Sequence, residues 1–557
     1  MSHASLAEYL PPSCGFDRVV MNLTVASEGV QFDRLAVMYL GDIEVWRTST
    51  AEPKSHPGIS WTYWKDMTNY LPLWKERQKL IFDLGNIVDG KYTGAFNVTL
   101  TAQFFSTKDE VKSDQHHDPA TQIIPISAKR SGDGKGSAFK YPGDVVSVGV
   151  QLPQAAVRAI VSISATGQSD EEFWETNVPD SVQANATGAF GKSAFREVRL
   201  LIDGQIAGLA WPYPVVFTGG ISPPLHRPMV GIQAFDLWES EIDITPWLGT
   251  LCDGSEHALS LQVVGEKAQP PGSYWIMTGK VFVWVSDKTN QTTTGPAPQV
   301  SLDPVDLKSS GGGDNGGPVS YRQSIARSIR VSSELEIAGQ RKNYTWSQRY
   351  SMRNDGSITN GGNDQYVEAL YEGESTATSG LLPHFYVGFR YPFTVNMTSA
   401  NEKDSLKSTT TLEQGIEFTV TGKSAFSYGI EAFSNRLETE VSGSVLQTTR
   451  EAVAVFYQNK NGSTTSGESE SHQTYKFGGR APHDTVGQRF DASPLLYSRN
   501  VKVTGDKRIK DDVFVYRSDY KTSAETLSGS KFVKGFAPVP DEQAPGIAIF
   551  MGKGTTG

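Results

Sequence analysis

The chain has 557 residues and a mass of 60.8 kDa, and 51 Lys and Arg against 61 Asp and Glu give it a net charge of −10. With 38% hydrophobic residues it is able to bury full cores over two to four domains of about 100 to 200 residues each, which excludes disorder as its main state. Its Lys and Arg are scattered singly. Because nucleic-acid affinity comes largely from clustered cations, we expect no nucleic-acid partner.

Cysteine content and hydropathy narrow the class further. Only Cys14 and Cys252 are present, which allows one long-range disulfide or two free thiols but no four-cysteine zinc site. The longest charge-free stretch, residues 204–225, contains four prolines that would break a spanning helix. We therefore predict no membrane span in this chain.

Glycosylation signals indicate a compartment. Sequons of the form N-x-S/T begin at Asn22, Asn97, Asn185, Asn290, Asn343, Asn396 and Asn461. The opening MSHASLAEYL lacks the charged-then-apolar pattern of a secretory signal. We expect a secreted protein, or one of a vacuolar or lysosomal lumen, that is itself N-glycosylated and whose leader is absent from this chain.

The hydrophobic pattern has a period of two residues almost throughout, which is typical of β-strands. In chain order it predicts strands at residues 19–25, 32–40, 94–105, 157–164, 198–202, 257–264 and 281–285. Two-residue turns at Gly41-Asp42 and Asp203-Gly204 suit β-hairpins. The sequence thus predicts an all-β protein.

Two segments repeat in the same order. FDRLAVMYLGDI aligns with FREVRLLIDGQI at an offset of 163 residues, and DMTNYL resembles DITPWL further on. This pattern favours a tandem duplication. We predict a first jelly-roll β-sandwich at residues 1–145 and a second at 146–290, which is the size that such a fold needs.

The remaining chain has a different composition. Residues 291–320 are rich in Gly, Pro, Ser and Thr without periodicity, which predicts a linker or exposed loop. Runs such as SIARSIRVSSELEIAG and FYVGFRYPFTVNMT, with a turn at Asn461-Gly462, predict a C-terminal all-β domain at 321–557. The fold class we expect is a tandem jelly-roll pair followed by a further all-β domain.

Common catalytic and metal signatures are missing from the sequence. It contains no G-x-S-x-G, H-E-x-x-H or C-x-x-C motif. His116-His117-Asp118 lies in a polar stretch before a proline, without a partner histidine at helical spacing, and we interpret it as a solvated loop. We expect neither a metal nor a cofactor.

Two carboxylates stand near the first hairpin. Strand alternation would place Asp33 on one face with Leu35, Val37 and Tyr39. Desolvation there would raise its pKa toward that of a proton-transfer group. The alternative is an Asp that closes a strand end or pairs with an Arg. Glu52 follows the hairpin, close to Trp61 in sequence, although a Glu before Pro is usually a surface residue.

Residues 168–193 form a long connection that contains four Glu and Asp residues around Phe173 and Trp174, with Asn177 beyond. Long loops on a β-scaffold are functional or disordered. A disordered tether rarely carries aromatic residues among acids, so we interpret the segment as the wall of a site. Aromatic rings pack against the C–H faces of sugars, and carboxylates and arginines bond to hydroxyls. This composition suits a saccharide pocket.

Seven blocks in order carry a family resemblance: CGFDRVVMNLTVASEGVQFDRLAVMYLGDIEVWRTSTAEP, GISWTYWKDMTNY, LGNIVDGKYTGAFNVTL, EEFWETN, FREVRLLIDGQIAGLAWPYPVVFTGGI, HRPMVGIQAFDL and EIDITPWLG. They resemble peptide N-glycanase A of plants and fungi, closely over residues 12–290. The resemblance implies hydrolysis of the amide between N-acetylglucosamine and asparagine, without a metal, on an N-glycopeptide or glycoprotein substrate at acidic pH.

More distantly, the chain is similar to the bacterial enzyme of the same activity, which has two jelly rolls with the site between them. Its essential Asp stands in an aromatic-Asp-Arg segment, which Phe32-Asp33-Arg34 matches. Its second acid precedes a Phe-Arg pair, but Phe195-Arg196 here follows Lys-Ser-Ala. Its third acid has no clear equivalent around residues 80–86. We therefore choose Glu172 as the second acid, with Glu52 next.

These inferences give a set of roles. We expect Asp33 to transfer protons at the amide and Glu172 to position water or sugar. The expected donors to the carbonyl or to sugar hydroxyls, together with the expected stacking surfaces and loop contact, are Arg34, Arg196, Arg227, Trp61, Trp174 and Asn177. The alternatives are an endoglycosidase and a lectin-like glycan-binding protein, because both would also use acids beside aromatics on such a scaffold.

Overall fold

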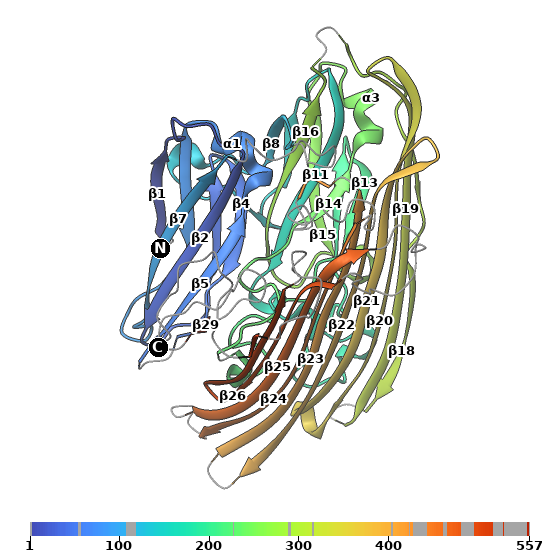
Figure 1. Cartoon of the computed structure of the whole chain (residues 1–557). Helices are drawn as coiled ribbons and strands as arrows, with labels where there is room; N and C mark the ends of the chain where they lie inside the picture. The colour runs from blue at the N-terminus through green and yellow to red at the C-terminus, as the bar shows by residue number, and fades with distance from the viewer. Residues whose placement is uncertain are drawn as a thin grey trace.

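The structure is a computed structural model, and it describes residues 3–53, 57–106, 119–226, 228–287, 291–314, 317–402, 405–422, 424–426, 443–459, 465–480, 495–515, 527–528 and 554–555. Figure 1 shows the N-terminal strands in blue, a second group of strands in blue-green and green, and long strands coloured from yellow to red beside them. None of the helices in the described ranges is long and apolar enough to cross a membrane.

The first sandwich has two antiparallel sheets. One contains, in spatial order, β1 (His3–Tyr9), β6 (Gln78–Leu84), β3 (Leu35–Leu40) and β4 (Ile43–Ser49). The other contains β29 (Gly554–Thr555), β5 (Ile59–Asp66), β2 (Arg18–Glu28) and β7 (Ala95–Phe105). Alternate residues of β2 are buried, as are Ala36, Met38 and Leu40 on β3, so the core lies between these faces.

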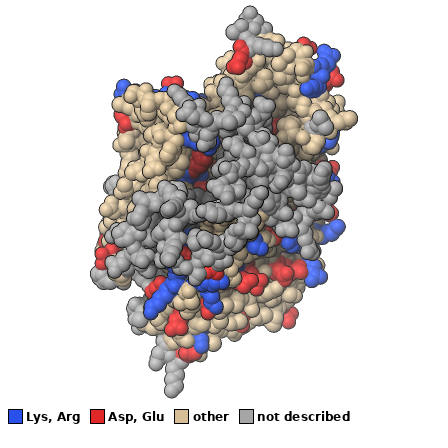
Figure 2. All heavy atoms as spheres, viewed as in Figure 1, with Lys and Arg blue, Asp and Glu red and all other residues tan. Residues whose placement is uncertain are grey.

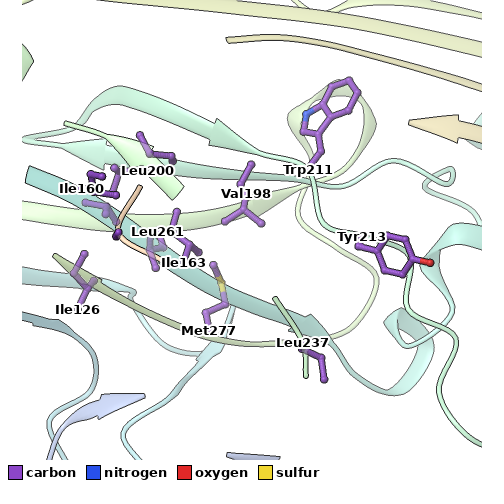
Figure 3. Close-up of a cluster of buried hydrophobic side chains, with 14 of the residues drawn as sticks. Ile126, Ile160, Ile163, Val198, Leu200, Trp211, Tyr213, Leu237, Leu261 and Met277 are labelled. Atoms are coloured by element: carbon purple, nitrogen blue, oxygen red, sulfur yellow. The ribbon is translucent and has the colours of Figure 1, made fainter. Parts of the chain in front are cut away.

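The second sandwich again has two antiparallel sheets. One contains β10 (Ser147–Val150), β15 (His257–Val264), β12 (Glu197–Ile202) and β13 (Gln205–Ala210). The other contains β14 (Ser240–Asp243), β11 (Ala156–Gly167), β16 (Trp275–Val285) and β8 (Gln122–Ile126), with β9 (Phe139–Tyr141) also paired to β16. Figure 3 shows their aliphatic core, including Ile160, Val198 and Met277.

The two sandwiches share one strand order. The repeated hairpins, β3–β4 and β12–β13, each lie at one edge of their sheet. The first strand of each hairpin pairs with a strand that follows a short helical segment, β6 in the first copy and β15 in the second. That segment is η1 (Thr68–Tyr70) with α1 (Leu71–Trp74) in the first copy, and η6 (Thr245–Trp247) with α3 (Leu248–Leu251) in the second. This arrangement is what the sequence repeat predicted, and both predicted hairpin turns are present.

The C-terminal sheet has twelve strands in antiparallel order. Its main path runs through β17 (Gln299–Leu302), β19 (Val319–Ile337), β20 (Gln340–Thr359), β21 (Asp364–Ser379), β22 (Leu382–Glu402), β23 (Ser405–Gly422), β24 (Gly443–Asn459), β25 (Thr465–Arg480), β26 (Leu495–Thr504), β27 (Lys507–Val515) and β28 (Leu527–Ser528). β18 (Asp306–Gly313) also pairs with β19. The predicted turn at Asn461-Gly462 lies outside the described residues.

The C-terminal sheet packs on the second sandwich through polar side chains as well as apolar ones. Gln348 bonds to both the N–H and the C=O of Leu209, and Gln414 donates to Pro214 O at 2.6 Å. Arg327 pairs with buried Glu197. Buried backbone N–H and C=O groups need hydrogen-bond partners. The glutamine side chains on this face of the C-terminal sheet supply such partners to the second sandwich.

Two predicted boundaries differ from the structure. β8 and β9 precede residue 145 yet pair with β16 of the second sandwich, so that sandwich begins earlier than predicted. The segment 291–320, predicted as a linker or loop, contains the short strands β17 and β18. Both strands pair with β19, and this tertiary pairing overrides a composition rich in Gly and Ser.

A buried polar network joins the two sandwiches. Arg47 and Glu44 form two hydrogen bonds of 2.8 and 2.7 Å, and Thr278 donates to Glu44 Oε2 at 2.6 Å. Lys280 donates to Glu44 O and pairs with Glu239 at 2.5 Å. Burial raises the pKa of Glu44, but the charges of Arg47 and Lys280 and the hydrogen bonds outweigh it and hold the pKa below its ordinary value. The network fixes the two sandwiches against each other.

Candidate active site

Asp33 lies in the chain that leads into β3, two residues before the strand begins. The strand was predicted to start at Phe32, so this start is a correction: two hydrogen bonds between Arg34 and Thr50 (2.9 and 2.8 Å) precede the ladder. Ser49 Oγ donates to Asp33 Oδ2 at 3.5 Å. This bond holds the carboxyl at the end of the β3–β4 hairpin, and the residue as a whole is half-buried.

Three predicted acids come together here. Burial, followed by the charges of Glu172 and Glu52, raises the pKa of Asp33 well above its ordinary value, against smaller lowering effects of its own backbone N–H and of Arg34. Burial also raises the pKa of Glu172, and the charge of Arg34 opposes that shift. Since such interactions require proximity, one site contains acids from both sandwiches, and it favours a protonated Asp33.

The acidic loop, residues 168–193, is anchored on both sides of Glu172. Glu171 is buried and receives two hydrogen bonds from Arg196 (2.5 and 2.7 Å), one from Gly272 N (2.7 Å) and one from Trp275 Nε1 (2.9 Å). Two 3₁₀ turns, η3 (Ser169–Glu171) and η4 (Trp174–Thr176), flank Glu172. The loop is ordered by these anchors and leaves Glu172 partly exposed between them.

Arg34 is the one predicted arginine that the described residues bring to the acids. Its Nη2 donates to Gln31 Oε1 at 2.8 Å, and its guanidinium lies 5.8 Å from the centre of the Tyr92 ring. Its Nε has no hydrogen-bond partner within the described part of the chain. This atom is buried, so among these residues the guanidinium beside the two acids keeps one hydrogen-bonding group unused in its interior.

Four other predicted contact residues are buried elsewhere. Trp61 is 1% exposed and stacks on Phe235 in the first sandwich, and Trp174 is 4% exposed between Trp275 and Tyr371. These two rings are therefore core residues and not sugar platforms. Arg196 is occupied by Glu171, and Asn177 is buried where η4 ends. Arg227 and His116-His117-Asp118 lie outside the described residues.

The aromatic surface that does lie beside Asp33 is made of Phe32 and Tyr92. Phe32 is 51% exposed, and the two ring centroids are 5.6 Å apart. Neighbouring exposed apolar residues are Val30, Ile87 and Val88. Phe32 belongs to the aromatic-Asp-Arg motif, so the sequence contained part of this surface. The stacking surfaces that we predicted were Trp61 and Trp174 instead.

Sequence reasoning also missed Glu175. Its carboxyl is fully buried, and neither oxygen has a hydrogen-bond partner within the described ranges. Burial, with the charges of Glu172 and Glu171, raises the pKa of Glu175 to about 8, against the lowering effects of its own backbone N–H and Arg196. From the sequence alone, the four acids around Phe173 and Trp174 look alike, although Glu171 is anchored, Glu172 is partly exposed and Glu175 is uncharged.

No group of three or more His, Cys, Asp or Glu residues in the described part of the chain is arranged to hold a metal ion. Cys14 is exposed and Cys252 is buried, and both are free thiols. Outside the residues drawn in grey, Figure 2 shows acidic and basic side chains interspersed on this face.

Comparisons with known proteins match this chain to one family. The family model described as peptide N-acetyl-beta-D-glucosaminyl asparaginase amidase A matches residues 1–300, and the model of the PNGase A C-terminal domain matches residues 320–393. Peptide-N4-(N-acetyl-beta-glucosaminyl)asparagine amidase A of Prunus dulcis is 35% identical over 302 residues, which cover 51% of this chain and 52% of that protein. The chain thus matches about half the length of that relative.

A solved structure described as "Structure of PNGF-II in C2 space group" is similar over 52% of this chain and 60% of its own, at 13% identity. Its TM-score of 0.34 is too low to support an argument about the fold. The family model, in contrast, covers more than half of the sequence and includes the acids of both sandwiches. The chain therefore belongs to the peptide N-acetyl-beta-D-glucosaminyl asparaginase amidase A family.

Proposed function

We propose that this protein hydrolyses the amide between the first N-acetylglucosamine of an N-glycan and asparagine in glycopeptides or glycoproteins, and leaves aspartate in the peptide. The observation that carries the proposal is the meeting of Asp33 and Glu52 from the first sandwich with Glu172 from the second. The Prunus dulcis relative is named for this activity, which supports the proposal.

The chemistry requires water, a proton acceptor and a proton donor. Glu172 accepts the proton of a water whose oxygen bonds to the amide carbon. The carbonyl carbon–nitrogen bond then breaks as Asp33 gives its proton to the departing nitrogen. The products are a carboxylic acid on the peptide and a glycosylamine, and a proton transfer from Glu172 to Asp33 restores the site. Water is the only co-reactant.

Arg34 supplies the electrostatic part of this mechanism. Its charge already acts on both Asp33 and Glu172, and we assign its guanidinium to stabilise the carbonyl oxygen as negative charge develops there. Phe32 and Tyr92 give the apolar face of a sugar a surface beside these groups. Arg227 stays a predicted contact.

One assay tests the function against its alternatives. A defined glycopeptide is incubated with the protein, and the peptide product is weighed by mass spectrometry. Aspartate at the former glycan site supports the amidase. N-acetylglucosamine retained on asparagine would identify an endoglycosidase, and untouched substrate with measurable binding would identify a lectin-like protein. Either of these results would overturn the proposal.

Asp33→Asn tests the assigned acid. We expect turnover to fall by about 10² to 10⁴-fold, because the amide side chain is unable to donate the proton that the nitrogen needs. Asp133→Asn is the control, since Asp133 is exposed in η2 (Ser131–Asp133). An Asp33→Asn variant that folds and keeps more than about a tenth of wild-type turnover would contradict the role of Asp33.

We also propose that the protein works in a secretory or acidic lumenal compartment and carries N-glycans. Among the sequons, Asn97, Asn343 and Asn396 are exposed, which supports these as acceptors, whereas Asn22 is buried. Mass spectrometry of protein secreted from a eukaryotic host tests this proposal. Unmodified asparagine at all three exposed sites would contradict it.

A further inference from the structure

Residues 211–239 join β13 to β14, and η5 (Pro223–His226) is the only helical segment in their described part. Most of this connection is buried, although connections of such length are usually exposed. Its backbone runs beside the first sandwich: Ser49 N donates to Ala234 O at 2.8 Å, and Leu237 N donates to Arg47 O at 3.0 Å. A connection of the second sandwich is thus bonded to the hairpin that holds Asp33.

Within this connection, residues 217–222 form a tight turn, which we call the glycine turn. Gly220 N donates to Phe217 O at 3.0 Å, and Gly220 O lies 3.0 Å from His226 Nε2. Thr218 Oγ1 donates to Thr50 O at 2.9 Å, two residues before Glu52. The turn is therefore tied both to its own loop and to the first sandwich.

The two glycines of this turn face two different walls of the site. A Cβ atom on Gly219 would lie 3.0 Å from Glu52 Oε2, and a Cβ atom on Gly220 would lie 2.6 Å from Phe173 Cε1. Phe173 directly follows Glu172 in the acidic loop. Because real Cβ atoms essentially never come closer than 3.0 Å to another atom, any larger residue at Gly220 would push the Phe173 ring and also the backbone oxygen of Phe217, which would lie 2.9 Å away.

We propose that Gly219 and Gly220 are positioning residues: Gly219 sets where the Glu52 carboxyl stands, and Gly220 sets how far the Glu172–Phe173 segment approaches it. This inference rests on the proposed function, since it assigns the spacing of the acids to the turn. Both positions then require glycine. A methyl group at Gly219 would displace the Glu52 carboxyl, and one at Gly220 would displace Phe173, although neither methyl group would touch the substrate.

The closing experiment compares Gly219→Ala with a matched control. Gly204→Ala is that control, because Gly204 has nearly the same φ (+82° against +86°) but nothing within 4 Å of its Cβ position. Both variants carry the same cost of a left-handed alanine. We expect Gly219→Ala to lower kcat by about tenfold to a hundredfold with a small change in KM, and Gly204→Ala to match the wild type.

A second readout separates positioning from general damage. Glu52→Asp shortens the acid and makes room for the methyl group, so the Gly219→Ala/Glu52→Asp double variant should lose less activity than the product of the two single losses. Likewise, Phe173→Leu should restore part of the activity lost in Gly220→Ala, while the approach of the added methyl group to Phe217 O stays. Gly219→Ala should shift the dependence of kcat on pH when Glu52 is present, because it moves that charge. In the Glu52→Gln background, where the charge is gone, Gly219→Ala should cause no such shift.

Equal losses in Gly219→Ala and Gly204→Ala would overturn the inference, because strain of the turn alone would then explain them. So would multiplicative losses in the double variants. Crystal structures keep the test independent of the proposed activity: Gly219→Ala should displace the Glu52 carboxyl and Gly204→Ala should not. If the wild type converts no glycopeptide, the proposed function fails, while a displaced Glu52 still supports the positioning role and an unmoved Glu52 removes it.

Discussion

Arg196 occupies in the second sandwich the position that Asp33 occupies in the first. Each residue follows a phenylalanine, Phe195 or Phe32, at the start of the repeated hairpin. In the first copy the position bears a partly exposed acid of the site, and in the second it bears the buried cation that anchors Glu171. The duplication thus gives one backbone position two roles, one chemical and one that holds the acidic loop.

This relationship predicts the effect of Arg196→Met. The variant leaves the buried Glu171 carboxylate without its charged partner, so we expect the unfolding free energy to fall by about 3 to 5 kcal/mol. Chemical denaturation measures it. Adding Glu171→Gln should restore part of the loss because both charges are then gone. Arg322→Met breaks an exposed ion pair and serves as the control. Equal losses in the two Arg variants would contradict the anchoring role.

Glu52→Gln should change the pH dependence of catalysis. The charge of Glu52 helps raise the pKa of Asp33, so its removal lowers that pKa. Asp33 must be protonated to donate, and activity is lost as pH rises through its pKa. The alkaline limb of kcat against pH should therefore move to lower pH. The same measurement on an exposed-site variant, Glu76→Gln, should show no movement. If the alkaline limb of Glu52→Gln stays in place or moves to higher pH, Glu52 does not raise the pKa of Asp33.

Glu175→Gln should alter how stability depends on pH. The pKa of Glu175 in the folded protein is about 8, above the ordinary 4.5, so the folded state keeps a proton that the unfolded state releases. This contribution is fully present below about pH 4.5 and is lost as pH rises toward 8. Urea unfolding at pH 5 and pH 8 should show the wild type losing on the order of a few kcal/mol more than Glu175→Gln. Parallel losses would contradict a neutral buried Glu175.

Phe32→Ala tests the aromatic surface beside Asp33. Since Phe32 is 51% exposed, its removal should barely affect folding but should raise KM for a glycopeptide by about twofold to tenfold, if the ring contributes as much as aromatic contacts do in general, about 0.5 to 1.5 kcal/mol. Phe105→Ala is the matched control. Phe105 is 46% exposed at the C-terminal end of β7, whereas Tyr92, the ring next to Phe32, precedes the N-terminal end of that strand. Unchanged KM in Phe32→Ala would place the sugar elsewhere.

Local pattern was sufficient to predict seven strands of the two sandwiches, but β1, β5, β8, β10 and β14 were not predicted. Residues 257–264 were predicted as a strand, and β15 has those bounds, because alternate apolar residues fit a face of the core. The turns at Gly41-Asp42 and Asp203-Gly204 were also predictable from local sequence. Two-residue hairpin turns require positive φ angles, which Gly, Asn and Asp adopt most readily. The repeat also conveyed the shared strand order, which no single strand reveals.

Side-chain roles depended on tertiary contacts that the sequence does not display. Trp61 and Trp174 looked like sugar platforms but fill the cores, since large rings contribute most when they are buried. Arg196 looked like a donor, and its partner Glu171 was hidden among neighbouring acids. The glycine turn was invisible for a similar reason, because it acts through space left empty against Glu52 and Phe173.

The joint built from Glu44, Arg47 and Lys280 has a consequence for dissecting this protein. Each ion pair of the joint lies within one sandwich, Glu44 with Arg47 and Lys280 with Glu239, whereas the hydrogen bonds from Thr278 and Lys280 to Glu44 cross between the sandwiches. Either sandwich produced as a separate fragment would therefore expose buried charges to water and lose these crossing hydrogen bonds. The two copies of the repeat therefore share partners for buried polar groups. Fragment complementation, with both halves expressed together, should recover folding that neither half achieves in isolation.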